Sequence, residues 1–216
     1  MAQPTSQPTS QALQSRARER RERILDAALA VFTRRGYREA TMDEVAEAAA
    51  TSKGGVYFHF PGKEALFLAL LERSATLLLE RTQQALQAAP DPAGKLDAAL
   101  EVVLRLFASH RGLARLFLVE ALAAGPAIQE ALLAIRRRFA ALIASELARA
   151  RQDGLIGPLD PQLAATACFG AIYEVVTQWL LSGSPADLAE AAPELRRLLR
   201  RLVGLPDRSP DEDRTP

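Results

Sequence analysis

The side chains best suited to chemistry stand close together between residues 51 and 59. Thr51 and Ser52 carry hydroxyls, Lys53 an ammonium, Tyr57 a phenol and His59 an imidazole. All five groups can form hydrogen bonds with phosphate oxygens or with the edges of bases. We therefore expect this segment to lie against duplex DNA.

Two glycines, Gly54 and Gly55, interrupt this polar segment in its first helical turns. Each costs a helix about 1 kcal/mol relative to alanine. That cost is reasonable where another surface must come close to the backbone. The pattern predicts a recognition helix with a bare side, which closes on the aromatic residues around Phe58.

The cysteine and histidine content argues against catalysis and metal binding. Cys168 is the one cysteine, which excludes an intramolecular disulfide and suits the cytosol. It lies in an apolar stretch and is expected to be a packed thiol. Two histidines, His59 and His110, provide neither a catalytic triad nor the spacing of a metal site. We expect no enzyme activity, no cofactor and no metal.

Helical patterns flank the polar segment on both sides. Apolar residues recur every three or four positions over about residues 12–35, which predicts a first helix. Thr41 and Glu44 have the spacing of a capping box, which predicts a second helix ending near residue 49. The polar segment is the third helix. After a Pro-Gly break, a long fourth helix is expected over 65–88.

The remaining two-thirds of the chain also predict helices, and no run is typical of a strand. Leucine and alanine dominate the composition and β-branched residues are few, which favours helix over sheet. Prolines mark most of the starts. The expected helices are 93–109, 112–124, 126–153, 161–182 and 186–204. We therefore predict an all-α protein of about nine helices.

Charge is unevenly distributed, although the net charge is only +1. Residues 1–63 hold 10 basic and 7 acidic residues, a net +3, which favours a basic N-terminal DNA-binding part. Arginines crowd the first helix at positions 16, 18, 20, 21 and 23. They are either a solvated face or phosphate contacts. The later arginine groups, at 136–138 and at Arg196, Arg197, Arg200 and Arg201, are expected on solvated faces of amphipathic helices. The longest apolar run, Ala65–Leu71, is too short to span a bilayer, and the polar N-terminus lacks a signal peptide's apolar core. A cytoplasmic protein is expected.

The N-terminal part resembles the tetracycline-repressor (TetR) family of bacterial transcription regulators. The resemblance covers about residues 18–72, with RERILDAALAVFTRRGY, TMDEVAEAA, TSKGGVYFHF and PGKEALFLALL in the family's order. It implies DNA contacts at Thr41, Thr51, Ser52, Lys53, Gly54, Gly55, Tyr57, Phe58, His59 and Lys63. Val56 and Phe60 are expected to pack inside a three-helix head. One departure is Ala50, at a turn where the family often has glycine.

The resemblance also implies a domain plan. We expect a disordered tail at 1–15 and a helix-turn-helix DNA-binding domain at 16–64. An effector-binding and dimerisation bundle at 65–205 and a second disordered tail at 206–216 follow. Candidate pocket residues are Phe67, Leu71, Leu104, Phe107, Phe117, Phe139, Phe169 and Tyr173. Candidate dimer-interface residues are Ile172, Val176, Trp179, Leu195, Leu198, Leu199 and Leu202.

The function that the resemblance implies is a ligand-responsive repressor that binds a near-palindromic operator as a homodimer. A small apolar effector would release it. The stretch FGAIYEVVTQW is similar to the fatty-acyl-CoA-responsive branch of the family, with Arg105 or Arg111 as candidate phosphate partners. Two alternatives remain open. One is a drug- or aromatic-compound-sensing repressor of an efflux operon, and the other is a ligand-independent DNA-binding protein.

Overall fold

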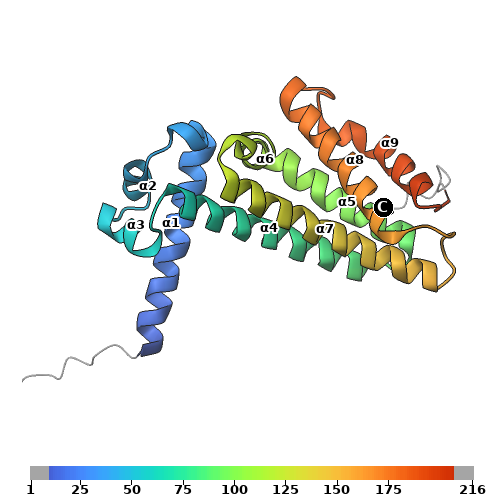
Figure 1. Ribbon diagram of the computed structural model, residues 1–216, viewed down its shortest axis with the longest axis horizontal. Helices are drawn as coiled ribbons and strands as arrows, with labels where there is room; N and C mark the ends of the chain where they lie inside the picture. The colour runs from blue at the N-terminus through green and yellow to red at the C-terminus, as the bar shows by residue number, and fades with distance from the viewer. Residues whose placement is uncertain (1–9, 207–216) are drawn as a thin grey trace, which may run out of the picture. The chain divides into compact units, whose positions relative to one another are not determined.

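A computed structural model describes residues 10–206, and side chains from residue 14 onward. Within this range the chain forms nine α-helices and a short 3-10 helix, with no strand (Figure 1). The all-α prediction is confirmed. Most of the two predicted tails lies outside the described residues, but residues 10–15 already belong to the first helix. The chain divides into two compact units, Met1–Leu71 and Glu72–Pro216.

The first unit, which we call the head, is built from α1 (Ser10–Glu39), α2 (Met42–Ala48), α3 (Lys53–His59) and the first turns of α4 (Lys63–Ala88). The apolar stripe predicted in the first helix is buried, as are the facing residues of the shorter helices. Among the largest fully buried side chains are Ile24, Leu25, Val31, Phe32, Val45, Leu66, Phe67 and Leu70. This core fixes α2 and α3 against α1.

Two local features set the angle between the helices of the head. Gly36 has φ 81° and ψ 161°, a conformation open to glycine but not to other residues, and it breaks the helical geometry of α1. Thr41 and Glu44 form the predicted capping box: the Thr41 side chain accepts from the Glu44 N–H, and the Glu44 carboxylate accepts from the Thr41 N–H. This second hydrogen bond is the largest cause of a lowered Glu44 pKa.

The turn between α2 and α3 places Ala50 at φ 49°, in the left-handed region. A Cβ in this region crowds the following carbonyl, at a cost of roughly 1–2 kcal/mol. Ala50 therefore adopts a backbone conformation that suits glycine, and its backbone is strained where that of glycine would not be.

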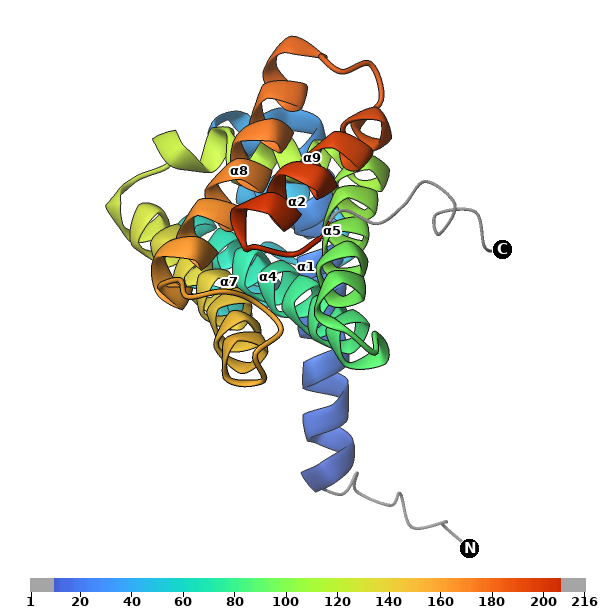
Figure 2. The same ribbon diagram turned by 90° about the vertical axis from the view of Figure 1, so that its right-hand side faces the viewer.

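The second unit contains the rest of α4 together with α5 (Pro92–Ser109), α6 (Arg111–Leu118), η1 (Glu120–Ala123), α7 (Pro126–Gln152), α8 (Pro161–Ser182) and α9 (Leu188–Leu202). Prolines begin α5, α7 and α8, as predicted from their positions. The single helix expected over 112–124 is divided, because a 3-10 turn follows Val119. α7 packs along α8, and α9 packs against both α5 and α8 (Figure 2).

The core of the second unit joins α5, α8 and α9. It includes Leu100, Leu104, Cys168, Trp179 and Leu199. By length and composition α8 is the one described helix that could cross a membrane, although core helices of other proteins have the same properties. Only 28% of its most apolar window is buried inside the unit, so much of α8 is available to another surface.

Candidate nucleic-acid interface

α3 and its N-cap residue lie in the segment that the sequence predicted to bind DNA. Ser52 is the N-cap, and its hydroxyl accepts from the Gly55 N–H at 3.1 Å. A Cβ placed on Gly54 would meet no atom within 4 Å, whereas one on Gly55 would lie 2.6 Å from the Thr51 hydroxyl oxygen. Gly54 therefore faces open space, and Gly55 permits the close packing of Thr51.

Lys53 begins α3 and is held by a carboxylate of α2. Its ammonium lies 2.8 Å from a carboxylate oxygen of Asp43, and both side chains are more than 60% exposed. The hydrogen bond and the charge of Asp43 raise the pKa of Lys53. Lys53 thus presents a fixed positive charge at the exposed start of α3.

The C-terminal half of α3 presents an aromatic surface. Tyr57 is 43% exposed and Phe58 is 82% exposed, the largest exposed fraction of any large apolar side chain in the described range. His59 is half-buried, and its ring lies 5.1 Å from that of Phe58. Burial lowers the pKa of His59, and the charges of Arg20 and Arg21 lower it further, which favours the neutral imidazole.

The opposite side of α3 is buried. Val56 is fully buried and Phe60 is 3% exposed, which confirms their predicted place in the core of the head. The guanidinium of Arg21 lies 5.2 Å from the Phe60 ring. The polar and glycine-bearing side of α3 is consequently the side that remains free.

Two predicted phosphate contacts have partners within the head. The Lys63 ammonium donates to the carbonyls of Arg38 (2.8 Å) and Ala40 (3.0 Å), and it lies 5.0 Å from the Tyr37 ring. The Thr41 hydroxyl serves the capping box. The spacing of Lys63 in sequence could not reveal this role, because its partners lie more than twenty residues earlier in the chain.

The predicted pocket residues separate into two groups. Phe67 and Leu71 lie in the head, where Phe67 packs on Phe32 and Tyr37 at ring distances of 5.5 and 4.7 Å. We therefore leave both out of an effector site. The other candidates lie in the second unit, at Leu104, Phe107, Phe117, Phe139, Phe169 and Tyr173.

Three of these residues form an aromatic row along α7 and α8. Phe169 stacks between Phe139 and Tyr173, with ring centroids 6.2 and 6.1 Å away. The Tyr173 hydroxyl donates to the carbonyl of Leu118, the last residue of α6, and accepts from Arg136, whose guanidinium lies over the Tyr173 ring. An arginine, an aromatic row and the end of α6 therefore meet at one place.

The predicted dimer interface needs correction. Val176, Trp179, Leu195 and Leu199 are at most 4% exposed in the single chain, because they form the core between α8 and α9. These side chains therefore leave almost no surface for a second chain. Leu198 and Leu202 are 54% and 44% exposed, and Ile172 is half-buried. Leu163 and Leu181, which were not among the predicted residues, are 69% and 58% exposed, and a helical wheel of α8 places them on one side.

Arginines of the second unit are also more constrained than their sequence suggested. Arg200, expected on a solvated face, is 3% exposed and binds the Asp97 carboxylate of α5. Arg105 pairs with Glu101. Arg111 donates to the Trp179 carbonyl, with its guanidinium 4.5 Å from the Trp179 ring.

Cys168 is a packed thiol, as predicted. Cys168 is buried, and burial raises the pKa of its thiol to about 11, which makes it unreactive. No group of three or more potential metal ligands occurs within residues 10–206.

A short exposed helix that follows a capped helix across a tight turn is a helix-turn-helix unit, and such a unit defines a DNA-binding transcriptional regulator. More particularly, the chain belongs to the TetR family. The family model described as "Bacterial regulatory proteins, tetR family" matches residues 24–70, and "Tetracyclin repressor-like, C-terminal domain" matches residues 89–203.

Relatives agree with this assignment. The chain is 30% identical over 173 residues to the uncharacterized HTH-type transcriptional regulator YhgD of Bacillus subtilis, over 78% of this chain and 88% of the relative. It is similar to the fatty acid degradation regulator FadR from Bacillus halodurans, with TM-score 0.77, 25% identity, and 86% and 99% of the two chains covered. The fold of Bacillus subtilis FadR, solved in complex with stearoyl-CoA, is also similar, with TM-score 0.76, 24% identity, and 82% and 96% covered.

Proposed function

We propose that this protein is a ligand-responsive transcriptional repressor that binds a near-palindromic operator as a homodimer in the cytoplasm. It catalyses no reaction in this proposal. The observation that carries it is the free side of α3: the Lys53 ammonium and the open backbone at Gly54 face outward, while Val56 and Phe60 anchor the helix from behind.

In this proposal α3 lies in the major groove. Lys53 and Ser52 meet phosphates at the rim, and Gly54 lets the backbone approach the bases. Tyr57 contributes a hydroxyl. Phe58 has no hydrogen-bonding group, so its contact with a base is apolar, as to a thymine methyl group. Thr41 and Lys63 are left out of this set because their polar groups are engaged inside the head.

Dimerisation is supported by the apolar side chains that one chain leaves exposed on α8 and α9. Leu181, Leu198 and Leu202 are each more than 40% exposed. A four-helix arrangement with the same helices of a second chain would bury them. Two heads held in this way would enter successive major grooves about 34–36 Å apart.

The effector we propose is a fatty acyl-CoA, supported by the likeness to the fatty acid degradation regulator FadR. The aromatic row of Phe139, Phe169 and Tyr173 suits an apolar chain, and Arg136 beside it suits an anionic group. The same row favours a second candidate, a flat aromatic compound stacked on these rings.

Release from DNA would follow if the effector binds the conformation that is free of DNA more tightly than the conformation that binds DNA. The Tyr173 hydroxyl joins α8 to the last carbonyl of α6, so an effector that engages Arg136 or Tyr173 competes with that link. The coupling free energy between effector binding and DNA binding is usually about 1–3 kcal/mol.

Selection of preferred duplexes from a random-sequence library, followed by fluorescence anisotropy, tests the proposal. We expect a near-palindromic site bound at least a hundredfold more tightly than random duplex, and loss of this binding with stearoyl-CoA but not with coenzyme A alone. Release by an aromatic drug such as tetracycline, and not by stearoyl-CoA, would support the second effector instead. Failure to prefer any duplex would refute the proposed function.

A further inference from the structure

Phe58 is the most exposed large apolar side chain of the head, at 82%. Within the part of the head that the structure describes, Tyr57 is the other exposed residue of this kind. Tyr57 ends in a hydroxyl, whereas the ring of Phe58 carries no polar atom. Single apolar side chains are common on protein surfaces, so exposure alone says little. Phe58, however, lies on the side of α3 that faces DNA in the proposed function.

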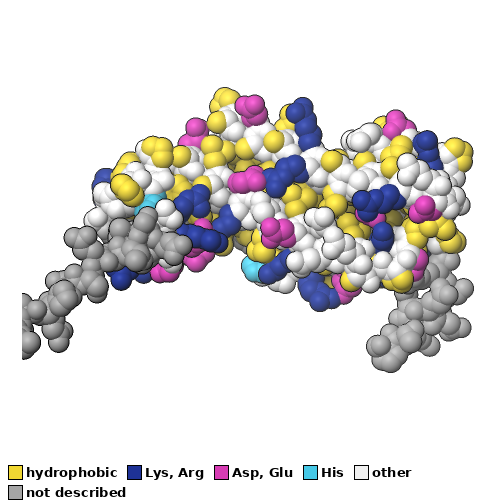
Figure 3. Space-filling model, turned by 90° about the horizontal axis from the view of Figure 1, so that it is seen from below, with side chains coloured by type: hydrophobic (Ala, Val, Ile, Leu, Met, Phe, Trp, Pro, Cys, Tyr) yellow, Lys and Arg dark blue, Asp and Glu magenta, His cyan; other side chains and the backbone are white. Residues whose placement is uncertain are grey.

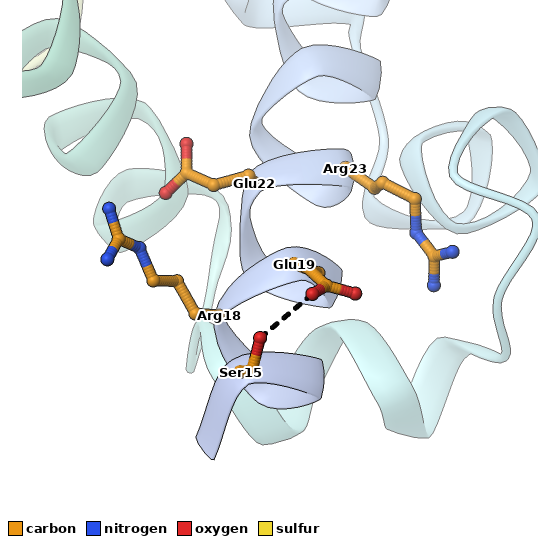
Figure 4. Close-up of a pocket in the computed structure, with 5 residues that line it drawn as sticks. All are labelled: Ser15, Arg18, Glu19, Glu22 and Arg23. Carbon is orange, nitrogen blue, oxygen red and sulfur yellow. Dashed lines mark hydrogen bonds between the residues drawn. The ribbon is translucent and has the colours of Figure 1, made fainter. Parts of the chain in front are cut away.

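The hollow at the start of α1 provides no comparable apolar surface. It has a volume of about 560 Å³ and is lined by Ser15, Arg18, Glu19, Glu22 and Arg23. Figure 4 shows Arg18 and Glu22 on one side of the helix and Arg23 on the other, with Glu19 accepting from the Ser15 hydroxyl at 2.9 Å. Because this lining carries both signs of charge and no large apolar side chain, the hollow selects neither an anion nor an apolar group.

The Phe58 ring is held in place by a row of rings that begins in the core. Its centroid lies 5.1 Å from that of His59, with the planes at 87°, and the His59 centroid lies 6.5 Å from that of Phe60. Phe60 is 3% exposed, so the row is anchored inside the head. Figure 3 shows hydrophobic side chains beside a histidine at the left of the view, where the head is drawn. A ring that is already held in this way loses little side-chain entropy when it binds.

Gly54 leaves an open place next to the Phe58 ring. The two residues are four apart, so they lie on the same side of α3, one turn from each other. Helical side chains lean toward the N-terminus, which directs Phe58 over the turn that contains Gly54. A Cβ on Gly54 would nevertheless meet no atom within 4 Å. Carbon atoms in contact stand about 3.5–4.0 Å apart, so this place, which we call the notch, has room for a methyl group.

The surroundings of the notch are closed or polar. A Cβ on Gly55 would lie 2.6 Å from the Thr51 hydroxyl oxygen, so that side of the helix is filled. Lys53 and Tyr57, also four apart, lie next to the notch, and they are close enough for Tyr57 to contribute to the raised pKa of Lys53. The notch is therefore an apolar place that is bordered by groups suited to phosphates.

We propose that the notch takes the methyl group of one thymine, or of one 5-methylcytosine, in each half of the operator. The inference rests on the proposed function, in which α3 lies in the major groove. Among the groups that unmodified base pairs present there, the thymine methyl is the apolar one, and the others are hydrogen-bond donors and acceptors. A methylated cytosine carries the same group in the same groove. Contact with Phe58 removes the methyl group and the ring from water, so affinity depends on this single group.

The test uses the full-length protein and the near-palindromic duplex that it selects, with affinity measured by fluorescence anisotropy. Each symmetric pair of thymines is replaced in turn by deoxyuridine, which removes the methyl group and leaves the base pair intact. At each such pair, and at each pair of cytosines, cytosine is compared with 5-methylcytosine.

Three variants are measured on the same duplexes. Phe58→Ala removes the exposed ring, and Gly54→Ala fills the notch with a methyl group of the protein. Leu133→Ala is the control, because Leu133 is a 47% exposed apolar residue of α7 in the second unit. Circular dichroism checks that each variant keeps its helicity.

One symmetric pair should respond to the loss of its methyl groups. Deoxyuridine there should weaken binding by the unchanged protein and by Leu133→Ala about 15-fold, which is about fourfold for each of two methyl groups. At the same pair 5-methylcytosine should bind more tightly than cytosine by a similar factor. In Phe58→Ala both differences should disappear. In Gly54→Ala the thymine methyl meets the added methyl group, so deoxyuridine should bind more tightly than thymine.

The failure of this inference can be distinguished from the failure of the proposed function. Selective duplex binding in which no pair shows a methyl effect that disappears in Phe58→Ala would overturn the inference alone. So would a Gly54→Ala variant that prefers thymine over deoxyuridine as strongly as the unchanged protein does. An unchanged protein that prefers no duplex would overturn the proposed function as well.

Discussion

The Lys53 ammonium of α3 lies 2.8 Å from the Asp43 carboxylate of α2, so the first charge of the recognition helix is held by the helix before it. Both side chains are exposed, and such pairs contribute little to stability. In the proposed complex with DNA, Asp43 would orient Lys53 and would also repel phosphate.

Replacing either partner should separate these two effects. Lys53→Ala should weaken binding to random duplex and reduce the salt slope by about 1, because one phosphate contact is lost. Asp43→Asn should strengthen random-duplex binding severalfold, because a negative charge beside the phosphates is removed. Both are measured by anisotropy at several salt concentrations. An unchanged salt slope in Lys53→Ala would show that this ammonium does not contact phosphate.

Side-chain size at Gly54 should control DNA affinity without affecting the fold. A Cβ here has open space in the free protein, so Gly54→Ala and Gly54→Leu should unfold at no lower urea concentration than the original chain. On DNA the added atoms occupy the place where the groove approaches. Affinity for the selected duplex should therefore fall moderately with alanine and by at least a hundredfold with leucine. A leucine variant that binds normally would remove α3 from the groove.

Lys63 should matter for stability more than for DNA. Its ammonium satisfies two carbonyls at the end of α1, and hydrogen bonds to charged groups contribute about 1.5–3 kcal/mol each when buried, less at this half-buried site. Lys63→Met keeps the apolar stem and should lower the free energy of unfolding of the head by about 2 kcal/mol in urea titrations. The salt slope of DNA binding should stay the same. Full stability combined with a slope reduced by about 1 would return Lys63 to the phosphate contacts that the family resemblance implied.

Ala50→Gly should stabilise the head. The residue has φ 49°, where alanine is strained by roughly 1–2 kcal/mol, while glycine loses part of this gain through its more flexible unfolded state. A net increase of about 1 kcal/mol is expected in the free energy of unfolding. Ala48→Gly, at the last residue of α2, is the control in a right-handed helical position and should destabilise, by at most about 1 kcal/mol. A loss of stability in Ala50→Gly would mean that the turn is not left-handed in solution.

The sequence alone determined the features that depend on neighbours along the chain. The capping box of Thr41 and Glu44, the proline starts of α5, α7 and α8, and the polar N-terminus of α3 were all visible, because each is built from residues within four positions of one another. Apolar periodicity identified the buried stripe of α1 in the same way.

Only the tertiary structure decided which partner each side chain finds. Periodicity shows that a helix has an apolar side, but it does not show whether another helix of the same chain or a second chain covers it. For this reason Val176 and Trp179 were assigned to an interface, although they lie in the core. Lys63 and Arg200 were similarly placed on the surface, because the carbonyls of Arg38 and Ala40 and the carboxylate of Asp97 come from distant segments. The sequence shows that a side chain is charged, but only the tertiary structure shows which acceptor it binds.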